Sequence, residues 1–218
     1  MACRGDLIVS KPDETTPKLR CLVLGIGNLL WADEGFGVRC VEALHERYEF
    51  PDDVKLLDGG TQGLYLVHEV QAAERLLVFD AIDYGIEPGT LKVVRGDEVP
   101  RFTGAKKMSL HQTGFQDVLS AAELLGGAPS QLTLVGVQAA MLEDYGGSLT
   151  PEVKAVFEEA LALGLTQLAA WGIEPKVRRQ AAPSLLHKGL DRAEYEGGRP
   201  SADDAFRLGD ERFIPKGA

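Results

Sequence analysis

The chain has 218 residues, of which 44% are hydrophobic and 26% charged, and these values suit one globular domain with a sizeable core. Its 23 basic and 33 acidic residues give a net charge of −10, which argues against nucleic acid as a partner because such binding relies on Lys and Arg at phosphates. No apolar run approaches the roughly 20 residues that span a bilayer, and the first residues lack the apolar centre of a secretory signal. We therefore expect a cytoplasmic protein that binds neither nucleic acid nor membrane.

The charge and the apolar pattern divide the chain into three parts. Residues 1–19 are polar and contain two prolines, which is typical of a flexible leader. Residues 20–174 carry a regular apolar pattern and form the predicted domain. Residues 175–218 hold nine basic and seven acidic residues and no sustained apolar period. They are predicted to be an extended or disordered tail, with a docking segment as the alternative.

In chain order, the domain alternates predicted strands with predicted helices. The strands are expected at 20–27, 54–57, 75–82, 90–95 and 131–138. The helices are expected at 35–48, 64–73 and 114–125, and from Thr150-Pro151 to near Trp171. Such alternation favours a mainly parallel sheet with helices on both faces. The expected fold is therefore α/β, a three-layer α/β/α sandwich with five strands, in which 90–95 is a candidate edge strand.

Acidic residues and one histidine follow the predicted strands. Ligands in an open α/β sheet bind at the carboxyl ends of the strands, so side chains in the loops that follow these ends are expected to meet at one edge of the sheet. The histidine lies in a polar loop after the fourth strand, whereas the other histidines fall in helices or in the tail. The candidates are Asp33, Glu34, Asp58, Asp80, Asp83 and His111.

Two of these acidic pairs leave a choice open. Asp33 and Glu34 are adjacent, and one short loop cannot aim both at the same centre, so one of them is expected to cap the helix that begins at Gly35. Asp80 directly ends its apolar strand and so points from the sheet edge, whereas Asp83 is better placed to shape the following turn.

Several common chemistries are excluded by missing motifs. The run Gly25-Ile26-Gly27 has Leu30 where a dinucleotide fingerprint needs its third glycine, so no nucleotide cofactor is expected. Cys3, Cys21 and Cys40 form no CxxC pair, which favours reduced, buried thiols over a nucleophile. Two carboxylates with one imidazole instead suit a cation such as zinc, nickel or iron.

Four strings, GIGNLLWADEGFGVR, DGGTQG, FDAIDYG and SLHQTG, occur in this order between about Leu22 and Trp171. Together they resemble the nickel-iron hydrogenase maturation proteases, most closely those that serve uptake or membrane-bound hydrogenases. The resemblance implies an endopeptidase that removes a C-terminal peptide from the nickel-loaded precursor of the hydrogenase large subunit, a late step in maturation.

The same resemblance implies roles for particular residues. Glu34, Asp80 and His111 would be catalytic and would contact nickel, which the substrate precursor supplies. Asp58, Gly59, Gly60 and Thr61 match a loop linked to substrate recognition, although glycines there are also explained by a tight turn alone. Two other functions stay open: a nickel-dependent checkpoint chaperone that binds the precursor without cleaving it, and an autonomous metallohydrolase.

Overall fold

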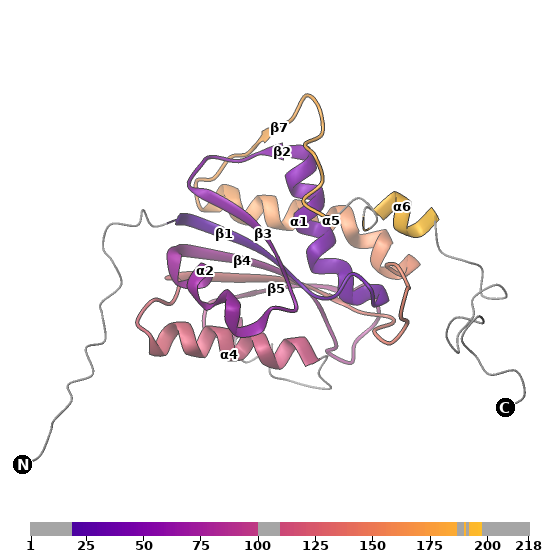
Figure 1. Ribbon diagram of the computed structural model, residues 1–218, viewed down its shortest axis with the longest axis horizontal. Helices are drawn as coiled ribbons and strands as arrows, with labels where there is room; N and C mark the ends of the chain where they lie inside the picture. Colours follow the sequence, from indigo (N-terminus) through magenta and orange to yellow (C-terminus); the bar gives the residue numbers. More distant parts are fainter. Residues whose placement is uncertain (1–18, 100–109, 187–189, 191, 198–218) are drawn as a thin grey trace, which may run out of the picture.

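The computed structural model describes residues 19–99, 110–186, 190 and 192–197 (Figure 1). Its central sheet has the strand order β3-β1-β4-β6-β5, and every neighbouring pair is parallel except β5 and β6. The expected five-stranded, mainly parallel sheet is confirmed, with the fourth predicted strand at an antiparallel edge. The strands are β1 (Leu19–Ile26), β3 (Val54–Gly60), β4 (Ala73–Ile82), β5 (Leu91–Arg95) and β6 (Gln131–Gln138).

Helices cover both faces of the sheet, as a three-layer sandwich requires (Figure 1). On one face α1 (Phe36–Arg47) and α5 (Pro151–Ala170) pack against side chains such as Val23 and Phe79. On the other face α2 (Val67–Ala72) and α4 (Leu110–Leu124) pack against the alternate residues, such as Leu22. The strands are apolar along their whole length because both faces are buried.

Two cysteine thiols lie inside this core, as the sequence predicted. Cys21 and Cys40 are both fully buried and form no disulfide. Burial raises the pKa of the Cys21 thiol to about 12, so this thiol stays protonated and is a poor nucleophile. Cys3 lies outside the described residues.

The start of α1 lies directly on the ends of two strands. A Cβ atom on Gly37 would overlap the carbonyl oxygens of Ile26 and Phe79. Gly27 has a φ of 131°, and a Cβ atom there would overlap the carbonyl oxygen of Glu34. Only glycine fits at these positions, and the loop after β1 can therefore fold back tightly over the end of its strand.

The structure corrects three local predictions. Residue 111, expected in a loop, lies in the first turn of α4, which begins at Leu110. Thr150 was expected to cap α5, but its side chain makes no capping hydrogen bond to that helix, although Pro151 does occupy the first turn as predicted. The segment expected as one helix over 64–73 is a short 3-10 turn, η2 (Gly63–Leu66), followed by α2.

The segment after residue 174 is extended in its first part and docks on the domain. Strand β7 (Lys176–Val177) pairs antiparallel with β2 (Tyr48–Glu49), and a short helix α6 (Arg192–Gly197) lies further along (Figure 1). The predicted leader before residue 19 and the chain beyond residue 197 lie outside the described residues. Among the helices of the described ranges, none has both the length and the apolar character needed to cross a membrane.

Candidate active site

The loop that carries Glu34 is hydrogen-bonded to a second loop that lies more than a hundred residues later in the sequence. We call residues 28–35 the glutamate loop, which includes the 3-10 turn η1 (Ala32–Gly35), and residues 139–150 the clamp loop. Because β1 and β6 are parallel to the same strand, both loops leave the sheet at the edge where the parallel strands end, which we call the carboxyl edge. Backbone N–H groups of Gly146, Ala32 and Asp33 donate to the carbonyls of Leu30 at 2.7 Å, Gly147 at 3.1 Å and Met141 at 3.1 Å, respectively.

Asp33 is fully buried and serves the clamp loop. Its Oδ2 accepts hydrogen bonds from the backbone N–H groups of Ala140 and Met141, both at 2.9 Å. Thr150 donates its backbone N–H to Oδ1 at 2.7 Å and its hydroxyl to Oδ2 at 3.0 Å. The carboxylate therefore ties the glutamate loop to the start of α5. It does not cap its own helix, since no side chain caps the start of α1 at Gly35.

Because Asp33 is hydrogen-bonded to the clamp loop, Glu34 is the better candidate of the two acids for a functional role at the carboxyl edge. It is half-buried, and it lies close enough to Asp80 for the two charges to interact. Asp80 sits near the end of β4 with 5% of its surface exposed. Burial, reinforced by the Glu34 charge and partly offset by a hydrogen bond from Ala81, raises the pKa of the Asp80 carboxyl well above its usual value. Two like charges in a desolvated place attract a cation.

Two residues near the end of β4 were missed by the sequence analysis. Burial and then the Asp80 charge raise the pKa of the Tyr84 hydroxyl, so this ring stands next to the acid. Gln138 accepts the Tyr84 backbone N–H at 2.7 Å and donates to Asp83 at 3.1 Å. Asp83 also accepts the Gly85 N–H at 3.1 Å, which confirms its predicted role in shaping the turn. The sequence signal that could have indicated Gln138 is a polar side chain at the end of the apolar run of β6.

The Asp58 loop lies beside the glutamate loop. The Asp58 carboxylate accepts the Gly60 N–H at 2.9 Å, and Gly60 has a φ of 45°, which favours glycine. The Gly60 carbonyl in turn accepts the Gly27 N–H at 3.0 Å. Burial, with a smaller contribution from Glu42, raises the pKa of Asp58. These contacts account for Asp58 and Gly60 through a tight turn, and Thr61 is exposed; the predicted role of this loop in substrate recognition stays a prediction.

The predicted histidine can be placed only by its backbone. Residue 111 is the second residue of α4, a helix that precedes the parallel strand β6, so this end of α4 faces the carboxyl edge. The His111 side chain lies outside what the structure describes. Within the described residues no three His, Cys, Asp or Glu side chains form a metal-binding group. Glu34 and Asp80 supply two carboxylates that fit part of a cation's ligand set.

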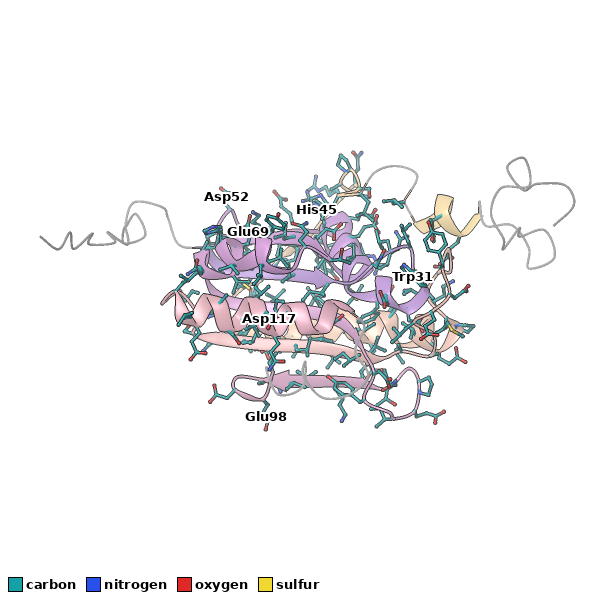
Figure 2. The ribbon with its side chains drawn as sticks, turned by 60° about the horizontal axis from the view of Figure 1, so that its bottom comes forward. Trp31, His45, Asp52, Glu69, Glu98 and Asp117 are labelled. Atoms are coloured by element: carbon teal, nitrogen blue, oxygen red, sulfur yellow. The ribbon has the colours of Figure 1, made fainter. Side chains whose placement is uncertain are left out.

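Large apolar side chains are exposed on several segments of the carboxyl edge. Trp31 packs edge-on against Tyr145 with ring centroids 5.4 Å apart, and Figure 2 shows Trp31 at the opposite end of the molecule from Asp52. Tyr65 is 86% exposed and Tyr145 is 68% exposed. A polypeptide could cover such a surface, since contiguous exposed apolar groups mark interaction sites. Large exposed side chains on loops of the carboxyl edge are Leu30, Leu64, Tyr65, Met141 and Tyr145.

The fold and this edge describe an α/β protein with an acidic site beside an apolar docking surface, and comparisons with known proteins identify the class. A family model described as hydrogenase maturation protease matches residues 38–167. The hydrogenase expression/formation protein HoxM of Azotobacter vinelandii is 59% identical over 202 residues, which is 93% of this chain and 97% of that protein. HupD of Rhodobacter capsulatus is 57% identical over 91% of this chain and 95% of its own length.

A solved structure supports the same assignment. The hydrogenase maturating endopeptidase HybD from Escherichia coli matches with a TM-score of 0.69 and 46% identity, over 73% of this chain and 98% of that one. The chain therefore belongs to the hydrogenase maturation protease family and is a peptidase. The family that the four sequence strings implied and the fold that the alternating strands and helices predicted are both confirmed. The roles of Glu34, Asp80 and His111 are not tested by these likenesses and stay predictions.

Proposed function

We propose that the chain removes the C-terminal peptide from the nickel-loaded precursor of a nickel-iron hydrogenase large subunit. In this proposal Glu34, Asp80 and His111 contact nickel that the precursor carries. The observation that supports it best is the buried Asp80 carboxyl, which lies within electrostatic reach of Glu34. Burial and the Glu34 charge disfavour the ionised form of Asp80 in the free protein, and a divalent cation brought by the substrate would relieve both penalties.

The chemistry divides between the substrate's metal and the residues of this chain. A bound metal can polarise a carbonyl or lower the pKa of a water, and it can also hold a substrate in register. Glu34 and Asp80 offer oxygen atoms to it, and the clamp loop keeps Glu34 in place through Asp33. The Trp31–Tyr145 pair lies beside them and would contact the polypeptide near the cut. Cleavage would then depend on metal insertion, because only a loaded precursor completes the contacts.

The proposal places the reaction in the cytoplasm. Cys21 and Cys40 are buried and form no disulfide, which fits a reducing compartment. The partner is then a precursor that has received its metal in the same compartment.

The test is to incubate the full-length chain with nickel-loaded precursor and with nickel-free precursor, and to measure the intact mass of the precursor over time. We expect a C-terminal peptide to be lost from the loaded form only. Glu34→Gln and Asp80→Asn should slow this loss by about 100-fold or more, as removal of groups that stabilise a transition state does. Asp83→Asn is the matched control, since it lies three residues from Asp80, keeps its acceptor for Gly85 and should cleave normally.

Each contrary outcome points to a different function. Complete cleavage by Glu34→Gln would overturn the site, and cleavage of nickel-free precursor at the normal rate would overturn metal gating. A stable nickel-dependent complex with no mass change would indicate a checkpoint chaperone. Tight binding of nickel or zinc by the purified chain in equilibrium dialysis would indicate an autonomous metallohydrolase.

A further inference from the structure

The described residues after position 174 (175–186, 190 and 192–197), which we call the strap, contact α1 at several points along its length. At its first end β7 pairs with β2, and Arg178 donates its backbone N–H to the Arg47 carbonyl at 2.9 Å. The Arg178 side chain donates to the carbonyls of Tyr48 at 2.9 Å and His45 at 3.1 Å. These bonds satisfy carbonyls at the end of α1, which have no partners within the helix. The strap is thus fastened to the amino side of the domain, far from the carboxylates.

The middle of the strap covers a buried ion pair on α1. Arg39 and Glu42 are 2.9 Å apart, with 4% and 6% of their side chains exposed. The Ser184 hydroxyl donates to Glu42 at 2.8 Å, and Arg39 donates to the Leu190 carbonyl at 2.6 Å. A buried ion pair is favourable only when its remaining hydrogen-bonding atoms find partners. The strap supplies such partners, so its course along α1 is set by specific contacts.

The far end of the strap reaches the clamp loop. Glu196 in α6 accepts a hydrogen bond from the Ser148 hydroxyl at 2.6 Å and contacts the Lys154 ammonium at 2.8 Å. Arg39 lies over the Tyr195 ring at 5.9 Å from its centroid, which holds this end of the strap against α1. Ser148 is therefore joined to the strap on one side and belongs to the clamp loop on the other.

Ser148 stands between two of the clamp-loop residues that hold the glutamate loop. Gly147 accepts the Ala32 N–H, and Thr150 donates twice to Asp33. Ala32 has a φ of 37°, a left-handed conformation that a non-glycine residue keeps only when its surroundings impose it. Any looseness of the clamp loop would release this conformation and move Glu34.

We propose that the strap is a positioning element of the active site, in which Glu196, acting through Ser148 and the clamp loop, keeps Glu34 facing Asp80. The inference rests on the proposed function for the role of Glu34, but the mechanical link from strap to glutamate loop does not. The strap lies within the 93% of the chain that the Azotobacter relative matches, whereas about a quarter of the chain has no counterpart in the solved Escherichia coli structure.

The test uses full-length variants and follows both rate and local opening. Glu196→Ala should lower kcat for precursor processing by about tenfold, with KM nearly unchanged, because a displacement of 1 Å costs up to about 100-fold. Ser148→Ala should do the same, and the double variant should be no slower than either single variant, since both remove one link. Glu196→Gln keeps an acceptor for Ser148 and should recover most of the rate.

A matched control separates positioning from general stability. Glu158→Ala removes another α5 ion pair, with Arg47 at 2.7 Å, and should leave kcat unchanged. Hydrogen exchange of residues 28–35 should become faster in Glu196→Ala and stay normal in Glu158→Ala. Unchanged exchange and kcat in Glu196→Ala, or additive losses in the double variant, would overturn the strap's role. If wild type cleaves nothing, the proposed function fails, and the exchange measurement still decides the mechanical link.

Discussion

The two edges of the central sheet differ in how their charged side chains are arranged. At the amino edge, where the parallel strands begin, Arg20 pairs with Asp53 at 3.1 Å and Arg75 pairs with Glu74 at 3.2 Å. At the carboxyl edge Asp80 lies within electrostatic reach of a second acid, Glu34, and burial, reinforced by the Glu34 charge, raises the pKa of Asp80. The amino edge offsets its charges internally. The carboxyl edge instead brings two acids within electrostatic reach of each other, which suits a site that receives a cation with its substrate.

Backbone geometry follows the same division. The carboxyl edge holds Ala32 at a positive φ and needs glycine at Gly27, whose Cβ would overlap the Glu34 carbonyl. Sparsely populated conformations persist where the surroundings impose them, and they concentrate at functional sites. These conformations cost stability at the carboxyl edge. Some substitutions there should therefore raise the free energy of unfolding while they lower the processing activity.

The largest expected effect comes from Asp33, the acid that serves structure at the functional edge. Asp33→Ala leaves four donor groups without their acceptor, namely the backbone N–H groups of Ala140, Met141 and Thr150 and the Thr150 hydroxyl. We therefore expect the free energy of unfolding to fall by about 3–5 kcal/mol. Glu34→Ala, one residue away, should change it by less than about 1 kcal/mol. Urea denaturation of both variants measures the contrast, and equal losses would show that the two acids share one role.

At Asp80 a substitution is expected to raise the free energy of unfolding rather than lower it. The raised pKa means that the folded protein disfavours the ionised carboxyl, so the wild type loses stability as pH rises from the ordinary aspartate range toward the raised value. Asp80→Asn removes this loss and should raise the free energy of unfolding at neutral pH by about 1 kcal/mol, while processing is lost. Urea denaturation at several pH values tests this; a variant that is less stable than wild type at neutral pH would contradict it.

Much of the fold could be predicted because its signals are local. Five apolar runs and the helical spacing between them predicted the sheet and its layers, and an alternating pattern marked β5 as an edge strand. A docking segment was only the alternative for this part of the chain, and the contacts of the strap were not predicted. Strands β2 and β7 have only two residues each, too few to show any period, and the other contacts of the strap depend on side chains far apart in the sequence.

The site was predictable to the level of its loops but not of every residue. Both Asp33 and Glu34 suit a functional acid by position, and the choice between them is made by Ala140, Met141 and Thr150, more than a hundred residues later. A periodic pattern carries no information on such hydrogen bonds. Gln138 was missed for the same reason, since its partners lie in the turn after another strand.

A smaller effect, on substrate binding rather than on stability, is expected at Asp58, which also lies at the carboxyl edge. Asp58→Asn keeps an oxygen for the Gly60 N–H and removes only the charge, so the fold should keep its stability within about 0.5 kcal/mol. If the charge recognises the precursor, KM for processing should rise by about threefold to tenfold with kcat retained. Steady-state processing kinetics measure both constants; a loss of kcat at unchanged KM would instead make Asp58 a base that acts on water.

The smallest effect is expected at the amino edge, and it decides whether the division between the edges is real. Asp53 has 51% of its side chain exposed in its pair with Arg20, so Asp53→Asn should lower the free energy of unfolding by less than about 1 kcal/mol. Processing should stay within about twofold of wild type, because this exposed ion pair lies at the opposite edge of the sheet from the glutamate loop and should not be coupled to it. A large loss of processing with normal stability would mean that the precursor also contacts the amino edge, and that the charges paired there serve recognition as well as solvation.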